Sequence, residues 1–374
     1  MRLRLVVVSG FVAGLGIVSG ATPARAETIA LTQISTSFSQ PIGIDYHVPT
    51  NSVITSVNYP SGLPYNLERI NQDGSHTQFS TLSGITEEIK ITTVKSDVGG
   101  FLTGQLFIGN GVDGQITRIS PDGSVINNGW VDLGTGVGLM RGSLFIDETG
   151  VWGNDLIAVT TGGEAWRIDS AATSNCSAGC TKLSDENVHL EGMMVVPDDP
   201  LTWGPWAGRI IAGAEEQSRL YYWDNNGADA GSRGFLTMNV QVEDIDLIAP
   251  NMNFFGVNYG MGRILGAGAS QFTNVVGQIM LTQEVVPGGT SGLFSMRYDF
   301  ATNALVVTPF TFSGAPSSTN IQNIGQWEHV TFAAAGINEI PGTNTAVPEP
   351  TTILLLGSAL AGMGTRRMMR KRTE

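Results

Sequence analysis

The stretch that decides the fold is residues 104–126, which read GQLFIGNGVDGQITRISPDGSVI. Three short apolar runs are separated by a glycine-rich turn around Gly111 and by the turn Pro121-Asp122-Gly123. Glycine and Asp-Gly pairs supply the backbone conformations that tight turns need. The runs are rich in β-branched residues and too short for helices, so the stretch predicts consecutive antiparallel strands.

Related strand pairs recur along the chain, and each is preceded by another apolar strand. The pairs lie at 66–74, 154–169, 209–224 and 278–298, and the preceding strands start near residues 42, 88, 142, 191 and 244. The repeat is therefore about 50 residues long and contains four strands. One sheet cannot bury both of its faces alone, but sheets packed radially can, so the repeat predicts an all-β fold of the β-propeller type.

The number of blades depends on the two ends of the repeat region. Residues 327–332 resemble another first strand, which suggests six blades closed by an N-terminal strand at 28–38. Five blades with an insertion at 251–275 is the alternative. In either case we expect one propeller domain over residues 27–342.

The N-terminus has the features of a signal peptide. Arg2 and Arg4 precede an apolar run at 5–18, and Ala24 and Ala26 form an A-x-A cleavage site. We expect signal peptidase to remove residues 1–26. The alternative is a retained N-terminal membrane helix.

The C-terminal segment 343–374 is expected to be a linker followed by a sorting signal. Val347, Pro348, Glu349 and Pro350 precede an uncharged run, which is predicted to cross the membrane at about 351–365. As a helix, residues 350–365 would reach about 24 Å, which is shorter than the hydrocarbon layer of about 30 Å. A basic cluster follows at 366–372 and is expected to stay on the cytoplasmic side. Its members are Arg366, Arg367, Arg370, Lys371 and Arg372.

This three-part order resembles the PEP-CTERM sorting domain of Gram-negative bacteria. The resemblance implies recognition by an exosortase-type enzyme, with cleavage near the Pro-Glu-Pro motif. It also implies export through the inner membrane to the periplasm, the cell surface or an extracellular matrix, in connection with exopolysaccharide and biofilm. The membrane contact would then be transient, and a permanent tail anchor is the alternative.

Charge and cysteine content limit the partners of the mature region. Residues 27–346 hold 12 basic and 31 acidic residues, a formal charge of −19. Such a surface repels phosphate backbones, so nucleic acid is not expected as a partner. Cys176 and Cys180 are the two cysteines, and in an exported chain they suggest one disulfide. Metal binding by the pair is the alternative.

Acidic residues stand where the first strand of several modules begins. In a propeller these positions meet at the mouth of the central channel, so their carboxylates could bind Ca²⁺. With His189 and His329 they could instead form a hydrolytic site. A third interpretation is that they are solvated charges or partners of Arg141. The predicted set is Glu88, Glu191, Asp244 and Glu328, with Glu243 as the alternative to Asp244.

No nucleophile elbow, P-loop, dinucleotide-binding or HExxH motif occurs in the sequence, so no organic cofactor is indicated. The Trp-Arg-Ile-Asp phrase at 166–169 resembles NHL-like and gluconolactonase-like propellers. We therefore expect a non-enzymatic binding or scaffold propeller of the cell surface or the exopolysaccharide matrix. A metal-dependent, lactonase-like or other hydrolytic propeller is the alternative, and the sequence leaves open whether the protein is an enzyme.

Overall fold

The strands near the axis of this fold are buried on both faces, and that pattern determines how the sheets pack. In β12 (Leu156–Val159), Leu156 and Ala158 pack against one neighbouring sheet, whereas Ile157 and Val159 pack against another. Successive side chains of a strand point to opposite faces. A sheet built from such strands must therefore be covered on both sides.

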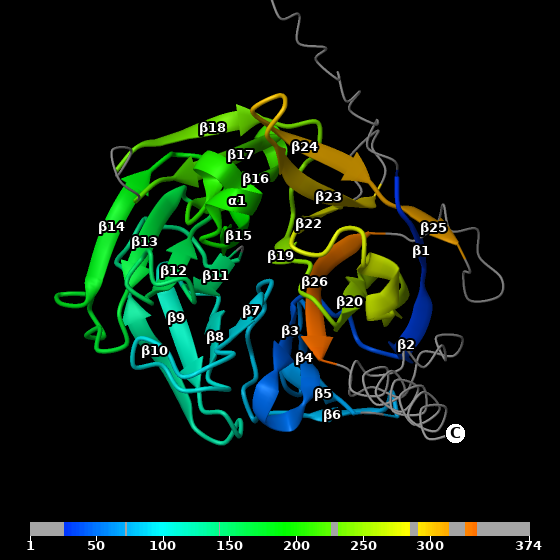
Figure 1. Cartoon of the computed structure of the whole chain (residues 1–374). Helices are drawn as coiled ribbons and strands as arrows, with labels where there is room; N and C mark the ends of the chain where they lie inside the picture. The colour runs from blue at the N-terminus through cyan, green and yellow to red at the C-terminus, as the bar shows by residue number, and fades with distance from the viewer. Residues whose placement is uncertain are drawn as a thin grey trace, which may run out of the picture.

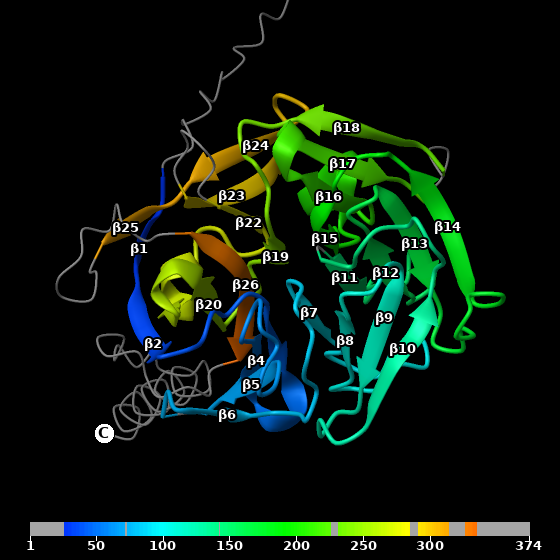
Figure 2. The same ribbon diagram turned by 180° about the vertical axis from the view of Figure 1, so that it is seen from behind.

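Six four-stranded antiparallel sheets surround a central axis, as Figures 1 and 2 show from opposite sides. The structure is a computed structural model that describes residues 26–71, 73–141, 143–225, 231–284, 291–313 and 326–334. The chain is a six-bladed β-propeller. In blades one to four, consecutive strands run from the centre outward. Blade one is β3 (Ile44–His47), β4 (Ser52–Ser56), β5 (Leu67–Ile70) and β6 (His76–Gln78); blade two is β7 (Ile91–Thr93), β8 (Leu106–Gly109), β9 (Gln115–Ile119) and β10 (Ile126–Asp132); blade three is β11 (Ser143–Ile146), β12, β13 (Glu164–Ile168) and β14 (Cys180–Asp185); blade four is β15 (Glu191–Val195), β16 (Ile210–Ala214), β17 (Arg219–Trp223) and β18 (Arg233–Thr237).

Blades five and six share one interleaved stretch of chain. After the inner strand of blade five, the chain forms the two middle strands of blade six and then returns to complete blade five. The inner strand of blade six comes from the C-terminal side, and its outermost strand comes from the N-terminal side. Blade five is β19 (Ile245–Leu247), β22 (Ile279–Gln283), β23 (Gly292–Asp299) and β24 (Ala304–Pro309); blade six is β26 (Trp327–Ala334), β20 (Met252–Asn258), β21 (Arg263–Ala267) and β2 (Thr32–Thr36).

A parallel strand pair and several short helical turns complete the described chain. The pair is β1 (Thr28–Ala30) with β25 (Thr311–Ser313), beside blade six. The helical turns occupy loops between strands. They are η1 (Val48–Thr50), α1 (Pro200–Trp203), η2 (Gly204–Trp206), η3 (Glu215–Gln217), η5 (Tyr259–Met261) and η6 (Ala269–Phe272).

The core consists of apolar layers between blades. Six clusters of buried, described residues correspond to the six blade interfaces. In blade one, for example, Val53 belongs to the layer against blade six and Ile54 to the layer against blade two. Both residues are fully buried. Burial of apolar area between blades is thus the main stabilising contribution to the ring.

The structure decides between the two predicted blade counts. Every strand expected to be innermost is an inner strand, and the six inner strands follow one another around the axis. The five-bladed alternative is wrong. Segment 251–275 is not an insertion, because it provides β20 and β21, which hydrogen-bond to β26 and β2 within blade six. As expected for six blades, an N-terminal strand closes the ring.

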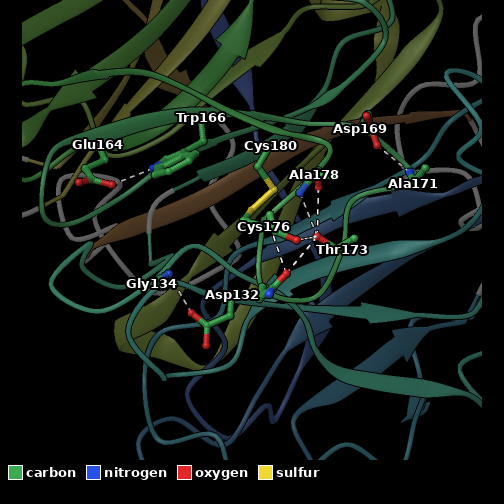
Figure 3. Close-up of a disulfide and its surroundings, with 12 residues drawn as sticks. Asp132, Gly134, Glu164, Trp166, Asp169, Ala171, Thr173, Cys176, Ala178 and Cys180 are labelled. Carbon is green, nitrogen blue, oxygen red and sulfur yellow. Dashed lines mark hydrogen bonds between the residues drawn. A yellow bond between two sulfur atoms is a disulfide. The ribbon is translucent and has the colours of Figure 1, made fainter.

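Cys176 and Cys180 form a disulfide at the outer edge of blade three (Figure 3), which confirms the predicted pair. Cys180 begins β14, and Cys176 lies in the preceding loop. Thr173 organises that loop, because its carbonyl oxygen accepts from the Cys176 N–H at 2.9 Å and its hydroxyl accepts from the Ala178 N–H at 3.1 Å. The bond closes a loop of only four residues' separation, so it constrains the unfolded chain little.

Candidate functional site

The starts of the inner strands and the ends of the second strands meet at one end of the channel. This follows from antiparallel pairing, which places the residue after a second strand beside the residue that begins the inner strand. Glu191 begins β15, and Glu328 is the second residue of β26. Glu215 and Glu284 directly follow β16 and β22.

Glu243 connects these carboxyl groups into two trios. Carboxylate oxygens of Glu191, Glu215 and Glu243 lie within 4.8 Å of one another, and so do those of Glu243, Glu284 and Glu328. Gly192 allows the close approach on the first side. Its φ is +42°, and a Cβ there would lie 2.6 Å from the Glu243 carbonyl oxygen. We call these five glutamates the acidic cluster.

Lys90 supplies a positive charge to this cluster. It directly precedes β7, and its side chain is 4% exposed. Its Nζ donates to Glu243 Oε1 at 2.7 Å and to the Glu243 carbonyl oxygen at 3.3 Å, and it lies 3.7 Å from Glu191 Oε2. Burial disfavours the charged amine, but the charges of Glu191 and Glu243 outweigh this effect and raise the pKa of Lys90.

Two histidines border the cluster. His189 Nε2 lies 2.8 Å from Glu191 Oε1. His329 is buried, with Nδ1 3.4 Å from Asp244 Oδ1 and Nε2 3.8 Å from Glu243 Oε1. Burial and the charge of Lys90 hold the pKa of His329 well below its usual range, so this ring is neutral at physiological pH.

The carboxyl groups of the cluster differ in their affinity for protons. Burial and the neighbouring charges of Glu191 and Glu284 raise the pKa of Glu215 to about 7. Burial, followed by the charge of Glu191, raises the pKa of Glu243, and burial with Glu284 raises that of Glu328. Burial also opposes ionisation of Glu191, but Lys90 and His189 outweigh it and lower its pKa. The cluster therefore holds more negative charge than its surroundings can neutralise, and it retains protons near neutral pH.

Two of the four residues predicted to bind a metal lie in the acidic cluster, and two do not. Glu191 and Glu328 belong to the acidic cluster, one in each trio. Glu88 instead pairs with Arg141, whose Nη2 lies 2.6 Å from Glu88 Oε2. Asp244 Oδ2 accepts from the Val330 N–H at 2.8 Å and so connects β19 to β26. Neither Glu88 nor Asp244 belongs to a trio of described residues.

Three members of the arrangement were missed from the sequence: Lys90, Glu215 and Glu284. A signal for the two glutamates does exist, because each is the first residue after the second strand of its blade. Because the two strands are antiparallel, the residue after the second strand lies at the same end of the channel as the residue that begins the inner strand. Lys90 carries no such signal, since a lysine beside a strand is usually exposed.

A cavity of about 740 Å³ occupies the rest of the channel. All six inner strands line it, and its walls include the aromatic side chains of Tyr46, Phe145 and Phe332. Lys90, Asp244 and His329 line the cavity and also contact Glu243 or one another. These three residues therefore separate the cavity from the acidic cluster.

The cavity also contains charged groups toward the ends of the inner strands. Asp45 Oδ2 accepts from the Thr93 N–H at 2.6 Å, and Asp45 also pairs with Lys95. Asp246 Oδ2 accepts from the Phe332 N–H at 3.1 Å. Glu148 and Asp198 complete the acidic groups of the lining. Two lysines therefore face five carboxyl groups in this cavity.

Because of Asp246, we expect the free energy of unfolding to depend on pH. Burial and the charges of Asp45 and Asp244 raise its pKa from 3.8 to about 8. Between these two pKa values the folded state keeps the Asp246 proton, whereas the unfolded state has released it. The contribution of Asp246 to the free energy of unfolding is therefore fully present below about pH 4 and is lost as the pH rises to about 8. In Asp246→Asn the free energy of unfolding should decrease less between about pH 4 and pH 8 than in the native chain, as measured by urea denaturation across that range. A parallel fall in both proteins would contradict the assignment.

A comparison with family models identifies the C-terminal segment. Residues 346–371 match the model described as the PEP-CTERM protein-sorting motif. The chain carries a PEP-CTERM sorting signal. The PEP-CTERM motif implies an exported protein that an exosortase processes. The motif lies outside the described residues, as do the basic cluster at 366–372 and residues 1–25 of the expected signal peptide 1–26. Within the described ranges, no helix is long and apolar enough to span a membrane.

Solved structures similar to this chain are distant in sequence. A candidate gluconolactonase is 12% identical, with a TM-score of 0.41, over 77% of this chain and 95% of its own. YCF48 bound to a D1 peptide is 13% identical, with a TM-score of 0.37, over 79% and 95%. A glucose dehydrogenase is 10% identical, with a TM-score of 0.32, over 64% and 99%. Similarities at this level carry no argument about function. No curated protein matches the chain significantly.

Proposed function

We propose that this exported propeller is a binding protein of the cell surface or the exopolysaccharide matrix, and that its central cavity holds a saccharide. The observation that carries the proposal is the cavity itself. Its volume of about 740 Å³ falls within the range of small-molecule sites, which combine apolar walls with a few polar groups. A signal peptidase and an exosortase-type enzyme would process the chain, with transient contact to the inner membrane.

The lining favours a neutral sugar. Phe145 is the half-buried aromatic residue of the lining and offers its ring to the apolar face of a sugar, whereas Tyr46 and Phe332 are packed between blades and add only a small exposed area. The hydroxyl groups of Thr149 and Thr331 donate to Asp147 and Asp45, and their oxygens can accept hydrogen bonds from sugar hydroxyl groups. The excess of carboxyl groups over lysines opposes an anionic ligand. A uronic acid should therefore bind more weakly than a neutral hexose of the same size.

Calorimetric titration of the full chain with neutral and uronic-acid oligosaccharides tests this function. We expect saturable binding of a neutral oligosaccharide and a loss of affinity of about tenfold or more in Phe145→Ala. Phe300→Ala is the matched control, because Phe300 is 59% exposed and does not line the cavity. Absence of binding, or equal loss in both variants, would reject the proposal.

Hydrolysis at the acidic cluster is the second candidate function. The observation that favours it is Glu215, whose pKa of about 7 suits a general acid or base at neutral pH. Turnover of a lactone or ester by the full chain, abolished in Glu215→Gln but not in the neighbouring Glu216→Gln, would support a hydrolase. Without turnover the binding function stands alone.

A further inference from the structure

Among the described residues, the acidic cluster contains more carboxyl groups than lysine or arginine cations. Five glutamates meet there, and among described residues the lysine or arginine that pairs with them is Lys90. Glu215, Glu284 and Glu328 make no ion pair with a described lysine or arginine, and the side-chain amide that reaches two of them is neutral: Gln326 Nε2 donates to Glu328 Oε1 at 3.0 Å and to Glu284 Oε1 at 3.3 Å. Burying a carboxylate without a cation beside it is costly, so such groups bind either protons or metal ions.

The spacing within each trio suits one hard divalent ion. Ca²⁺ takes oxygen ligands at 2.3–2.6 Å, so two ligands on opposite sides of the ion are about 4.6–5.2 Å apart. The three oxygens of each trio lie within 4.8 Å of one another. Each trio is therefore compact enough for one ion to contact all three glutamates.

His329 provides an independent indication of a ligand. Its side chain is 6% exposed, and its Nε2 has no hydrogen-bond partner among the described residues. That nitrogen lies on the side of Glu243, the residue shared by both trios, while Nδ1 faces Asp244. If Nδ1 donates its hydrogen to Asp244, Nε2 is an acceptor, which suits a water molecule bound to a cation.

We propose that the acidic cluster binds Ca²⁺, with Glu243 as the common ligand and Glu191, Glu215, Glu284 and Glu328 as the flanking ligands. Lys90 stands beside the site as a fixed positive charge and limits the affinity for the ion. The proposal is independent of the saccharide function, since none of the five glutamates lines the cavity.

Titration of the full chain with CaCl₂ after removal of metals by EDTA tests this site. At a pH above the pKa of Glu215 we expect saturable Ca²⁺ binding, weakened about tenfold or more in Glu243→Gln. Ca²⁺ should also raise the unfolding temperature of the native chain more than that of the variant. Glu216→Gln is the matched control, because Glu216 is exposed in the same helical turn, and it should bind like the native chain.

Absence of saturable binding, or native affinity in Glu243→Gln, would overturn the proposal. If Glu243→Gln does not fold, Glu215→Gln and Glu328→Gln replace it, because these residues flank Glu243 on opposite sides. At least one of them must bind Ca²⁺ more weakly than Glu216→Gln. Equal affinity in all three variants would likewise reject the site. Sugar binding, measured in the same samples, reports separately on the cavity.

Discussion

Lys90→Met is expected to lower the free energy of unfolding by about 3–5 kcal/mol. The lysine side chain is almost completely buried, and its Nζ is the donor to both the carboxylate and the carbonyl oxygen of Glu243. Methionine fills a similar volume but leaves Glu243 without its lysine partner and Glu191 with His189 alone. Urea denaturation of the two proteins at neutral pH measures the difference.

The same substitution should cost less in acid. Without Lys90 the two carboxyl groups bind protons more readily, so the penalty falls as the pH decreases toward the ordinary range of glutamate. Glu243→Gln in the Lys90→Met background should recover part of the lost stability, because it removes one ionisable carboxyl group from a cluster that has lost its lysine. A loss below about 1 kcal/mol at neutral pH would show that Lys90 is not the counter-ion of the cluster.

Trp327→Ala is expected to cost a similar amount, about 3–5 kcal/mol. Trp327 begins β26 and is fully buried. Its ring packs edge-on to Phe254 and lies on Gly256, where a Cβ would come within 2.6 Å of the indole. Alanine would leave a cavity that these two rigid strands of blade six cannot fill.

Hydrogen exchange should locate the damage of Trp327→Ala in blade six. We expect the amides of β20 and β26 to lose protection first, while those of blades two and three keep theirs. Phe300→Ala is again the control and should change stability by less than about 0.5 kcal/mol. Uniform loss of protection over all blades would mean that the ring unfolds as one unit.

The fold was predictable because the inner strands recur at a regular spacing in the sequence. Segments such as 191–195 and 327–332 are short and carry apolar residues on both faces, which leaves few alternatives to a radial arrangement of sheets. The interleaving of blades five and six was not predictable. Strands β20 and β21 look like any other hairpin, and their blade is chosen by long-range packing against β26 and β2.

The candidate site was predictable only where an acidic residue begins an inner strand. Glu191 and Glu328 fit that rule, and both reach the cluster. Asp244 also stands at such a start, but side chains alternate across a strand, and the adjacent Glu243 is the one that faces the glutamates. The burial of Lys90 depends on carboxylates that are about 100 and 150 positions away, so no local pattern reveals it.

Blade six is built from three distant regions of the polypeptide, and the ring can therefore close only late in the synthesis of the chain. Until Trp327–Ala334 emerges, β20 has one unpaired edge and the ring stays open between its first and fifth sheets. Exposed edges of this kind invite aggregation and proteolysis. The sorting motif begins at residue 346, a short distance beyond the strand that completes the ring. A nascent chain long enough to display that motif is therefore also long enough to finish folding, so shortened products would meet proteases before they could be sorted.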